Sequence, residues 1–142
     1  MFNMKYKQIC LMNKHDIRND DDIKRLVHTF YGNVQDDERL GYIFNDVAGV
    51  DWDNHLPRMV DFWSNLIFQT GRYKGRPFRQ HLPLPLEKED FHRWYTLFTK
   101  TVDGCFKGPR AEYTKEMAGK IAASFSLRFE MDGKFESKSI ES

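Results

Sequence analysis

The chain has 142 residues, which suits one domain with a sizeable hydrophobic core. Its net charge of +1, with acidic and basic residues interspersed, argues against nucleic-acid binding. No apolar run approaches the roughly 18 residues of a membrane span, and the N-terminus lacks the pattern of a secretory signal. We therefore expect a cytoplasmic protein without a membrane segment. Aromatic residues make up 15% of the chain, a composition that suits the lining of a large flat cavity.

The first elements follow from hydrophobic period and capping residues. Residues 1–18 have no sustained period and are expected to form a loosely ordered extension. Asn19 and the three aspartates after it are typical of a helix N-terminus, and the apolar period that follows extends to Val34. Residues 35–39 interrupt the period. A short apolar turn over 40–44 and a connector over 47–51 are expected next.

Three more helices are predicted. The first covers about 52–68, although Pro57 is expected to distort its first turn or to delay regular helix to Leu56. The second covers about 87–106, and Gly108 and Pro109 end it. The third covers about 111–131, where Ala118, Ala122 and Ala123 permit close helix packing, and residues 132–142 are expected to be disordered. With no strand-period segment, the class is all-α, with one domain over 19–131.

The cysteines predict little chemistry. Cys10 and Cys105 are too few for a disulfide scaffold. Cys105 lies on an apolar helix face, where a buried free thiol is the usual outcome. It has no neighbouring base, so we do not expect a nucleophile.

A glycine- and proline-punctuated segment before the 87–106 helix carries one histidine, His81. Pro77, Pro83 and Pro85 restrict the backbone around it, so the imidazole is presented with few conformations. Rigid presentation of one imidazole between apolar helices suits an axial iron ligand. The alternative is a surface histidine near a capped helix start.

Other metal sites fit the sequence poorly. Zinc needs three or four ligands, and no close pair of cysteines or histidines is present. A di-iron bundle needs two Glu-x-x-His motifs, and the chain has one, from Glu89 to His92. His28 and His92 are expected to be solvated, and His15 lies in the extension.

A haem accounts for more of the pattern, because it needs one axial imidazole, apolar walls and a few polar groups on the opposite face. His81 is the candidate ligand, and Tyr31, His55 and Trp94 are the polar-tipped candidates. The candidate wall residues are Phe44, Met59, Trp63, Phe78, Leu82, Phe91, Leu97 and Phe98. Lys74, Arg76 and Arg79 could pair with the propionates, or could simply be solvated. The alternative is a haem-free helical interaction module in which the aromatic residues fill an ordinary core.

Several ordered blocks resemble the group III (P-type) truncated haemoglobins. The blocks are FYGNV, IFND, HLPRMVDFW, GRYKGRPFRQHLPL, FHRWYTLF and IAASF, and they cover about 23–129. The resemblance implies a two-over-two helical sandwich around haem b. Carried across by motif, His81 matches the proximal ligand, Tyr31 and Trp94 the distal tyrosine and tryptophan, His55 the distal-helix histidine, and Phe44 the phenylalanine packed on the haem. The paired glycines usual in groups I and II are absent, which agrees with group III.

These assignments predict a monomer that binds oxygen, nitric oxide or carbon monoxide at the haem iron. Hydrogen bonds from Tyr31 and Trp94 should slow oxygen release, which suits redox chemistry better than oxygen transport. Nitric oxide dioxygenation and a peroxidase-like reaction are the two turnover reactions that stay open. The chain has no flavin or nicotinamide motif, so either reaction needs an external electron donor. His55 could coordinate the iron, gate the pocket or only line it.

Overall fold

The computed structural model describes residues 14–75 and 84–132. The predicted site residues outside these ranges are Arg76, Phe78, Arg79, His81 and Leu82, and Cys10 also lies outside them. The elements are α2 (Asp20–Asp36), α3 (Glu38–Gly41), the π-helical turn η1 (Tyr42–Val47), α4 (Trp52–Phe68), α6 (Lys88–Cys105) and α7 (Pro109–Met131). Among the described residues the only extended pairing is one isolated bridge, between His15 and Phe106, so the all-α prediction is confirmed.

α2 begins where its capping residues predict. The Asn19 side chain accepts the backbone N–H of Asp22, and three aspartates occupy the first turn. The apolar face is deeply buried, with Ile23, Leu26 and Phe30 fully covered.

A tight corner follows α2. Asp37 is extended and its carboxylate caps α3 by accepting the amides of Arg39 and Leu40. Gly41 lies against the end of α2, where an added Cβ would be 2.6 Å from the carbonyl oxygen of Gln35. The corner therefore needs a residue without a side chain. The predicted turn over 40–44 is longer in the structure, because η1 continues to Val47.

α4 has the predicted bounds, but the expected effect of Pro57 is wrong. The first turn is regular, and His55 donates its amide to the Asp51 carbonyl at 2.8 Å. Pro57 has no backbone donor and its ring crowds the carbonyl of residue i−4, yet α4 continues through it to Phe68. Asp51 is at the N-cap position, but its carboxylate accepts the side-chain amide of Asn54 instead of a backbone amide. Gln69 ends the helix in the left-handed region with a φ of 57°.

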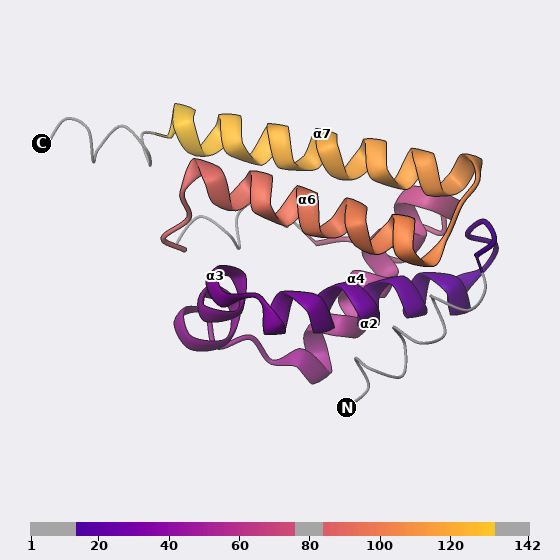
Figure 1. Cartoon of the computed structure of the whole chain (residues 1–142), viewed down its shortest axis with the longest axis horizontal. Coiled ribbons are helices and arrows are strands. Elements are labelled where there is room, and N and C mark those ends of the chain that lie inside the picture. The colour runs from indigo at the N-terminus through magenta and orange to yellow at the C-terminus, as the bar shows by residue number, and fades with distance from the viewer. Residues whose placement is uncertain (1–13, 76–83, 133–142) are drawn as a thin grey trace, which may run out of the picture.

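α6 and α7 form an antiparallel pair (Figure 1). α6 begins with a capping box between Glu87 and Asp90. The helices approach closely at Gly119, where an added Cβ would be 3.1 Å from the Tyr95 ring. Ala118 and Ala122 are buried as predicted, whereas Ala123 is exposed because it lies on the outer side of α7.

α7 begins two residues before its predicted start, because a residue distant in sequence caps it. The Asp16 carboxylate accepts the backbone amides of Arg110 at 3.0 Å and Ala111 at 2.8 Å. Next to Asp16, Ile17 is fully buried in the core. Residues 14–18 are therefore more ordered than their sequence predicts.

Cys105 lies at the end of α6 and is 1% exposed, as expected. Its sulfur is disulfide-bonded, so the predicted free thiol is wrong. Burial of a cysteine is predictable from an apolar stripe, whereas its oxidation depends on a second sulfur that the stripe does not reveal.

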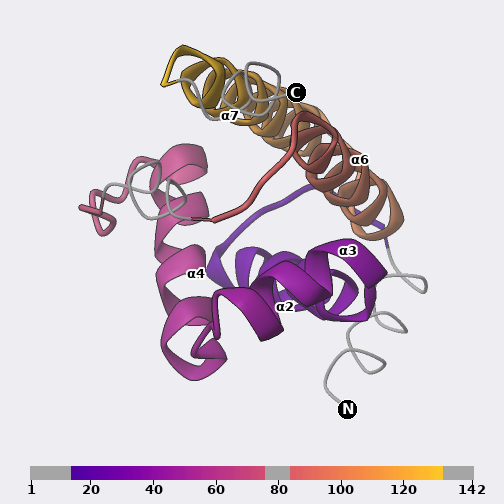
Figure 2. The same cartoon turned by 90° about the vertical axis from the view of Figure 1, so that its left-hand side faces the viewer.

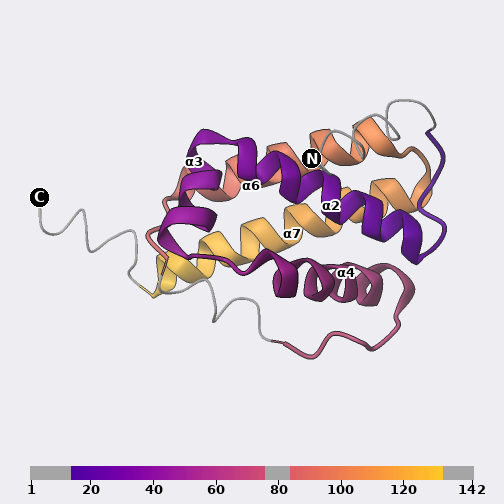
Figure 3. The ribbon, with the colours of Figure 1, turned by 90° about the horizontal axis from the view of Figure 1, so that it is seen from below.

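The helices form two layers, with α6 and α7 in one and α2 and α4 in the other (Figures 1 and 2). Seen from below in Figure 3, α2 and α4 extend side by side over part of their lengths with α7 behind them. The core between the layers contains a ring stack in which Phe98 lies between Trp63 and Trp94. The centroid of the Phe98 ring is 4.7 Å from that of Trp63 and 5.4 Å from that of Trp94. No described helix is both long enough and apolar enough to cross a membrane.

Candidate functional site

One apolar pocket opens between the two layers, and we call it the main pocket. It encloses about 900 Å³ of space free of protein atoms, its open mouth included. Its lining residues come from α2, the α3–η1 corner, α4, α6, α7 and both segments that flank residues 76–83. They are Tyr31, Leu40, Ile43, Phe44, His55, Met59, Phe62, Trp63, Tyr73, Leu84, Leu86, Asp90, Phe91, Trp94, Ile121, Ala122 and Phe125.

Tyr31 occupies the inner wall of the main pocket on α2. It is 4% exposed, and its ring meets the His55 ring edge to face at 5.1 Å. Burial, followed by the nearby Tyr73 hydroxyl, raises the pKa of Tyr31 well above its ordinary value. The phenol therefore stays protonated at neutral pH and can donate a hydrogen bond.

His55 projects from the first turns of α4 into an aromatic enclosure. Besides Tyr31, the rings of Phe44 and Trp52 pack around it, with centroids 6.5 and 5.6 Å from that of the imidazole. The Nε2 atom is buried. Trp52 is itself held by a hydrogen bond from its Nε1 to the Asn45 side chain at 2.9 Å. The imidazole is thus oriented by packing from three sides.

Trp94 is half-buried and lines the main pocket from α6. Its ring lies nearly parallel to Phe98, with 13° between the planes, and meets Phe30 edge to face at 5.7 Å. Aromatic contacts on two sides restrict its rotation. The structure therefore brings Tyr31, His55 and Trp94, from three different helices, to one pocket.

The predicted wall residues divide into two groups. Phe44, Met59, Trp63 and Phe91 line the main pocket, whereas Leu97 and Phe98 do not. Phe98 is fully buried within the ring stack, so it supports the wall from behind. Helical period placed it correctly on the inner face, but period alone does not separate core from pocket lining.

Sequence reasoning missed several lining residues. Ile121 and Phe125 of α7 line the pocket, but their i, i+4 spacing by itself predicts only an inward apolar face. Asp90 was missed because a charged residue among apolar ones is read as solvated, yet it is 5% exposed. No sequence signal indicated Tyr73.

Tyr73 lies in the segment after α4 and lines the main pocket. Its ring meets Phe62 edge to face at 5.1 Å, and its hydroxyl is buried without a hydrogen-bond partner among the described residues. A Cβ added to Gly75 would contact this hydroxyl and would be 3.0 Å from Nη2 of Arg58. A phenol that lines the pocket and an exposed guanidinium therefore lie close together, and both could donate to an anion.

The other three histidines in the described part of the chain lie outside the main pocket. His92 is exposed, as predicted, but His28 is half-buried, and burial followed by the charge of Lys24 lowers its pKa. His15 is half-buried on Phe106, with the rings 6.0 Å apart.

The group 3 truncated hemoglobin ctb of Campylobacter jejuni is 30% identical to this chain over 116 residues, covering 79% of this chain and 91% of that protein. The chain belongs to the group III truncated haemoglobins. The crystal structure of a group III truncated hemoglobin from Campylobacter jejuni superposes on this truncated haemoglobin with a TM-score of 0.74. That pair is 29% identical, and the match covers 82% of this chain and 94% of the crystallised one. No protein-family model matches the chain.

The family and the truncated-globin fold predicted from the sequence are thus confirmed. The similarity extends over 79% of the chain and assigns no role to any single side chain.

Proposed function

We propose that this truncated haemoglobin binds haem b in the main pocket and a diatomic gas at the haem iron. The observation that carries the proposal is the convergence of Tyr31, His55 and Trp94 on one apolar pocket. A large apolar cavity with a few convergent polar groups is the usual form of a cofactor site.

The pocket fits a haem in its chemistry. Its walls are largely aliphatic and aromatic, with a few polar groups among them, which is the usual lining of a cofactor site. We assign the axial ligand to His81, which lies outside the described residues. Tyr73 and Leu84, which lie on either side of this histidine in the sequence, both line the pocket.

A haem also carries two carboxylates, which need partners at the pocket mouth. Arg58 and the Tyr73 hydroxyl lie close together beside Gly75, and both are donors suited to a carboxylate. We propose them as propionate partners beside the earlier candidates Arg76 and Arg79. The buried Tyr73 hydroxyl would then gain the hydrogen bond that the described residues do not supply.

When bound, the haem supplies the iron at which the gas binds. The protein supplies the donors: Tyr31 through its protonated hydroxyl and Trp94 through Nε1–H. Each can donate to a gas ligand that carries partial negative charge. If each hydrogen bond contributes on the order of 1 kcal/mol, the two together slow oxygen release by tens-fold.

His55 has three roles open to it: iron coordination, gating of the pocket, or lining alone. Its enclosure by Tyr31, Phe44 and Trp52 supports a fixed position next to the distal donors. A low-spin absorption spectrum without added ligand, lost in His55→Leu, would assign it to the iron. A high-spin spectrum in both wild type and His55→Leu would mean that His55 only gates or lines the pocket.

Slow oxygen release would suit a redox reaction better than oxygen transport. We propose that the protein acts as a monomer in the cytoplasm. Nitric oxide dioxygenation and peroxidase-like oxidation are the candidate reactions. Both need an external electron donor, because the chain offers no second redox cofactor site recognisable from its sequence.

Absorption spectroscopy of the purified protein tests the proposal. We expect an intense Soret band, with distinct ferric, ferrous and carbonyl spectra. His81→Gly should lose the haem or its coordination spectrum, and added imidazole should restore the spectrum. The matched control is His92→Gly, which removes an exposed histidine of α6 and should leave the spectrum unchanged. A colourless protein that takes up no haemin would instead support the haem-free helical module.

A further inference from the structure

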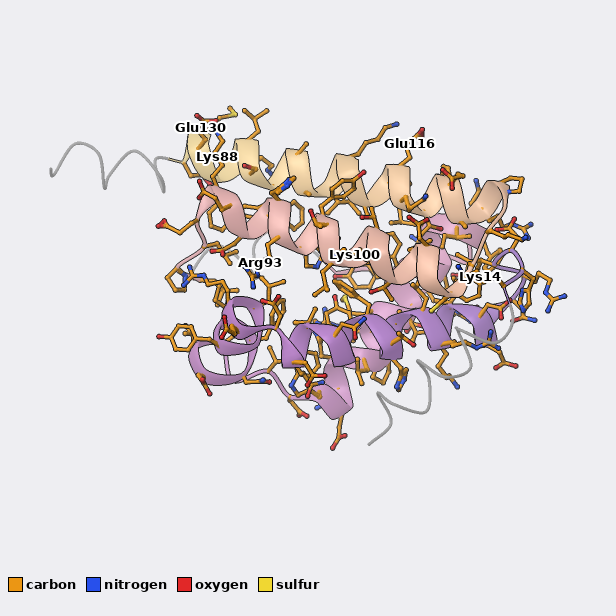
Figure 4. All side chains as sticks on the ribbon, in the orientation of Figure 1. Lys14, Lys88, Arg93, Lys100, Glu116 and Glu130 are labelled. Atoms are coloured by element: carbon orange, nitrogen blue, oxygen red, sulfur yellow. The ribbon has the colours of Figure 1, made fainter. Side chains whose placement is uncertain are left out.

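Two ion pairs cross between the α3 corner and the first turns of α6. Arg39 of α3 donates from Nε and Nη2 to the two carboxylate oxygens of Asp90, both at 2.9 Å. In the opposite direction, Nε of Arg93 on α6 donates to Asp37, at 2.8 and 3.1 Å. Figure 4 shows Arg93 reaching from α6 toward the α3 corner. We call these four residues the crossed pairs.

Asp90 is the inner member of the crossed pairs. It lines both the main pocket and a shallow outer groove that also contains Arg39 and Arg93, so it forms part of the wall between them. Burial opposes its ionisation, but hydrogen bonds from the Arg39 side chain and the Glu87 amide outweigh that effect and lower the pKa of Asp90. The Asp90 carboxylate is therefore charged, and both of its oxygens accept hydrogen bonds.

This arrangement constrains geometry more than a surface ion pair does. A bidentate guanidinium–carboxylate contact fixes both distance and direction, and leaving one buried partner unpaired is strongly destabilising. Lys88 and Glu130 provide a contrast at the same end of α6 (Figure 4). Their charged atoms are 3.9 Å apart and their side chains are 64% and 44% exposed, so that pair should contribute little.

The crossed pairs join two walls of the main pocket. The corner contributes Leu40 and Ile43 to the lining, and α6 contributes Phe91 and Trp94. Asp90 and Trp94 are four residues apart on α6 and thus lie on the same side of the helix. Rotation of α6 about its axis would move both residues together.

We propose that Arg39 is a positioning residue for the distal pocket, holding α6 through Asp90 at the rotation that presents Trp94 to the gas ligand. This inference rests on the proposed role of Trp94. Arg39 also donates to the Pro85 carbonyl at 3.3 Å, so it ties the segment just before α6 to the same point. Precise sites need such supporting contacts behind the residues that touch the ligand.

Fluorine NMR of the haem-free protein labelled with 5-fluorotryptophan tests the positioning directly. The chain has three tryptophans, so three resonances are expected, and Trp94→Phe and Trp63→Phe each identify one of them. Arg39→Gln should shift the Trp94 resonance by more than the Trp63 resonance, because Trp63 lies on the other side of Phe98 in the ring stack. Lys88→Gln, the matched control, should shift neither.

A double variant keeps the test interpretable if Arg39→Gln folds poorly. Arg39→Gln combined with Asp90→Asn leaves no buried unpaired charge, and the new amide oxygen can still accept the Glu87 amide. It should shift the Trp94 resonance as far as Arg39→Gln does, because the two residues act as one unit. An unmoved Trp94 resonance, or an equal shift of the Trp63 resonance, would overturn the proposal.

The haem-loaded protein provides the second arm. Arg39→Gln should release oxygen several-fold faster than wild type, and adding Trp94→Phe should bring no further increase. An unchanged off-rate together with a shifted Trp94 resonance would also overturn the proposal. If wild-type protein takes up no haem, the proposed function fails, while the NMR arm still decides whether Arg39 positions Trp94.

Discussion

Tyr31 and His55 meet edge to face in the main pocket, with ring centroids 5.1 Å apart and planes at 86°. The contact joins α2 to α4 and places a phenol and an imidazole on the same side of the pocket. In this geometry His55 packs against the Tyr31 ring and restricts its orientation. The Tyr31 hydroxyl can then donate to a ligand in the pocket. Its raised pKa keeps it a donor.

The first prediction concerns the distal donors. Tyr31→Phe and Trp94→Phe should each raise the oxygen off-rate about fivefold, because each loses one hydrogen bond of about 1 kcal/mol. Stopped-flow measurement of oxygen release checks this. The control is Tyr42→Phe, which alters an exposed tyrosine of η1 and should leave the rate unchanged. Unchanged rates in both pocket variants would remove these residues from the distal role.

The second prediction concerns the proposed propionate partners. Arg58→Gln and Tyr73→Phe should each speed haemin loss to an excess of apomyoglobin several-fold, because each removes a donor to a propionate. Lys100→Gln, which removes an exposed lysine on α6, is the matched control. Equal rates in all the proteins would assign the propionates to other residues.

The third prediction concerns the cap on α7. Asp16→Ala should lower the free energy of unfolding by about 1–2 kcal/mol, because two helix N-terminal amides lose their acceptor. Urea denaturation of the haem-free protein measures this. Asp53→Ala, an exposed carboxylate of α4, is the comparison and should change stability by much less.

The same cap predicts a pH dependence. Burial opposes ionisation of Asp16, but the amides of Arg110, Ala111 and Ile17 outweigh it, so its pKa in the folded protein lies below the ordinary 3.8. Its contribution is therefore complete above pH 3.8 and is lost as the pH falls through the lower, folded value. Asp16→Asn should flatten this part of the stability profile. A profile that matches wild type in this acidic range would contradict the assignment.

The fourth prediction separates core from pocket lining. Phe98→Ala should destabilise the haem-free protein by about 3–5 kcal/mol, because Phe98 is fully buried between Trp63 and Trp94. Leu127→Ala, on the exposed side of α7, should change stability by no more than about 0.5 kcal/mol. Thermal or chemical unfolding distinguishes the two. A small effect of Phe98→Ala would mean that the ring stack is not a packed core.

Local sequence signals predicted the helices well, because those signals act over one or two turns. The Asn19 cap and the apolar stripe of α4 depend only on neighbouring residues, and α2 and α4 begin and end close to their predicted bounds. Local signals failed where a distant residue intervened. Asp16 extends α7 by capping it across the fold, and Ile17 is held by a core that its own segment does not reveal.

The candidate site divides in the same way. Amino-acid order alone was enough to single out Tyr31, His55 and Trp94, because residue type and helical period mark a polar-tipped aromatic or imidazole on an inner face. Tertiary packing decided that these side chains share one pocket, that Phe98 supports the pocket from behind, and that Tyr73 and Asp90 belong to its lining. The physical reason is that the pocket forms only where the faces of several helices come together. The position and rotation of each helix depend on contacts such as Arg39 with Asp90, whose members are far apart in the chain.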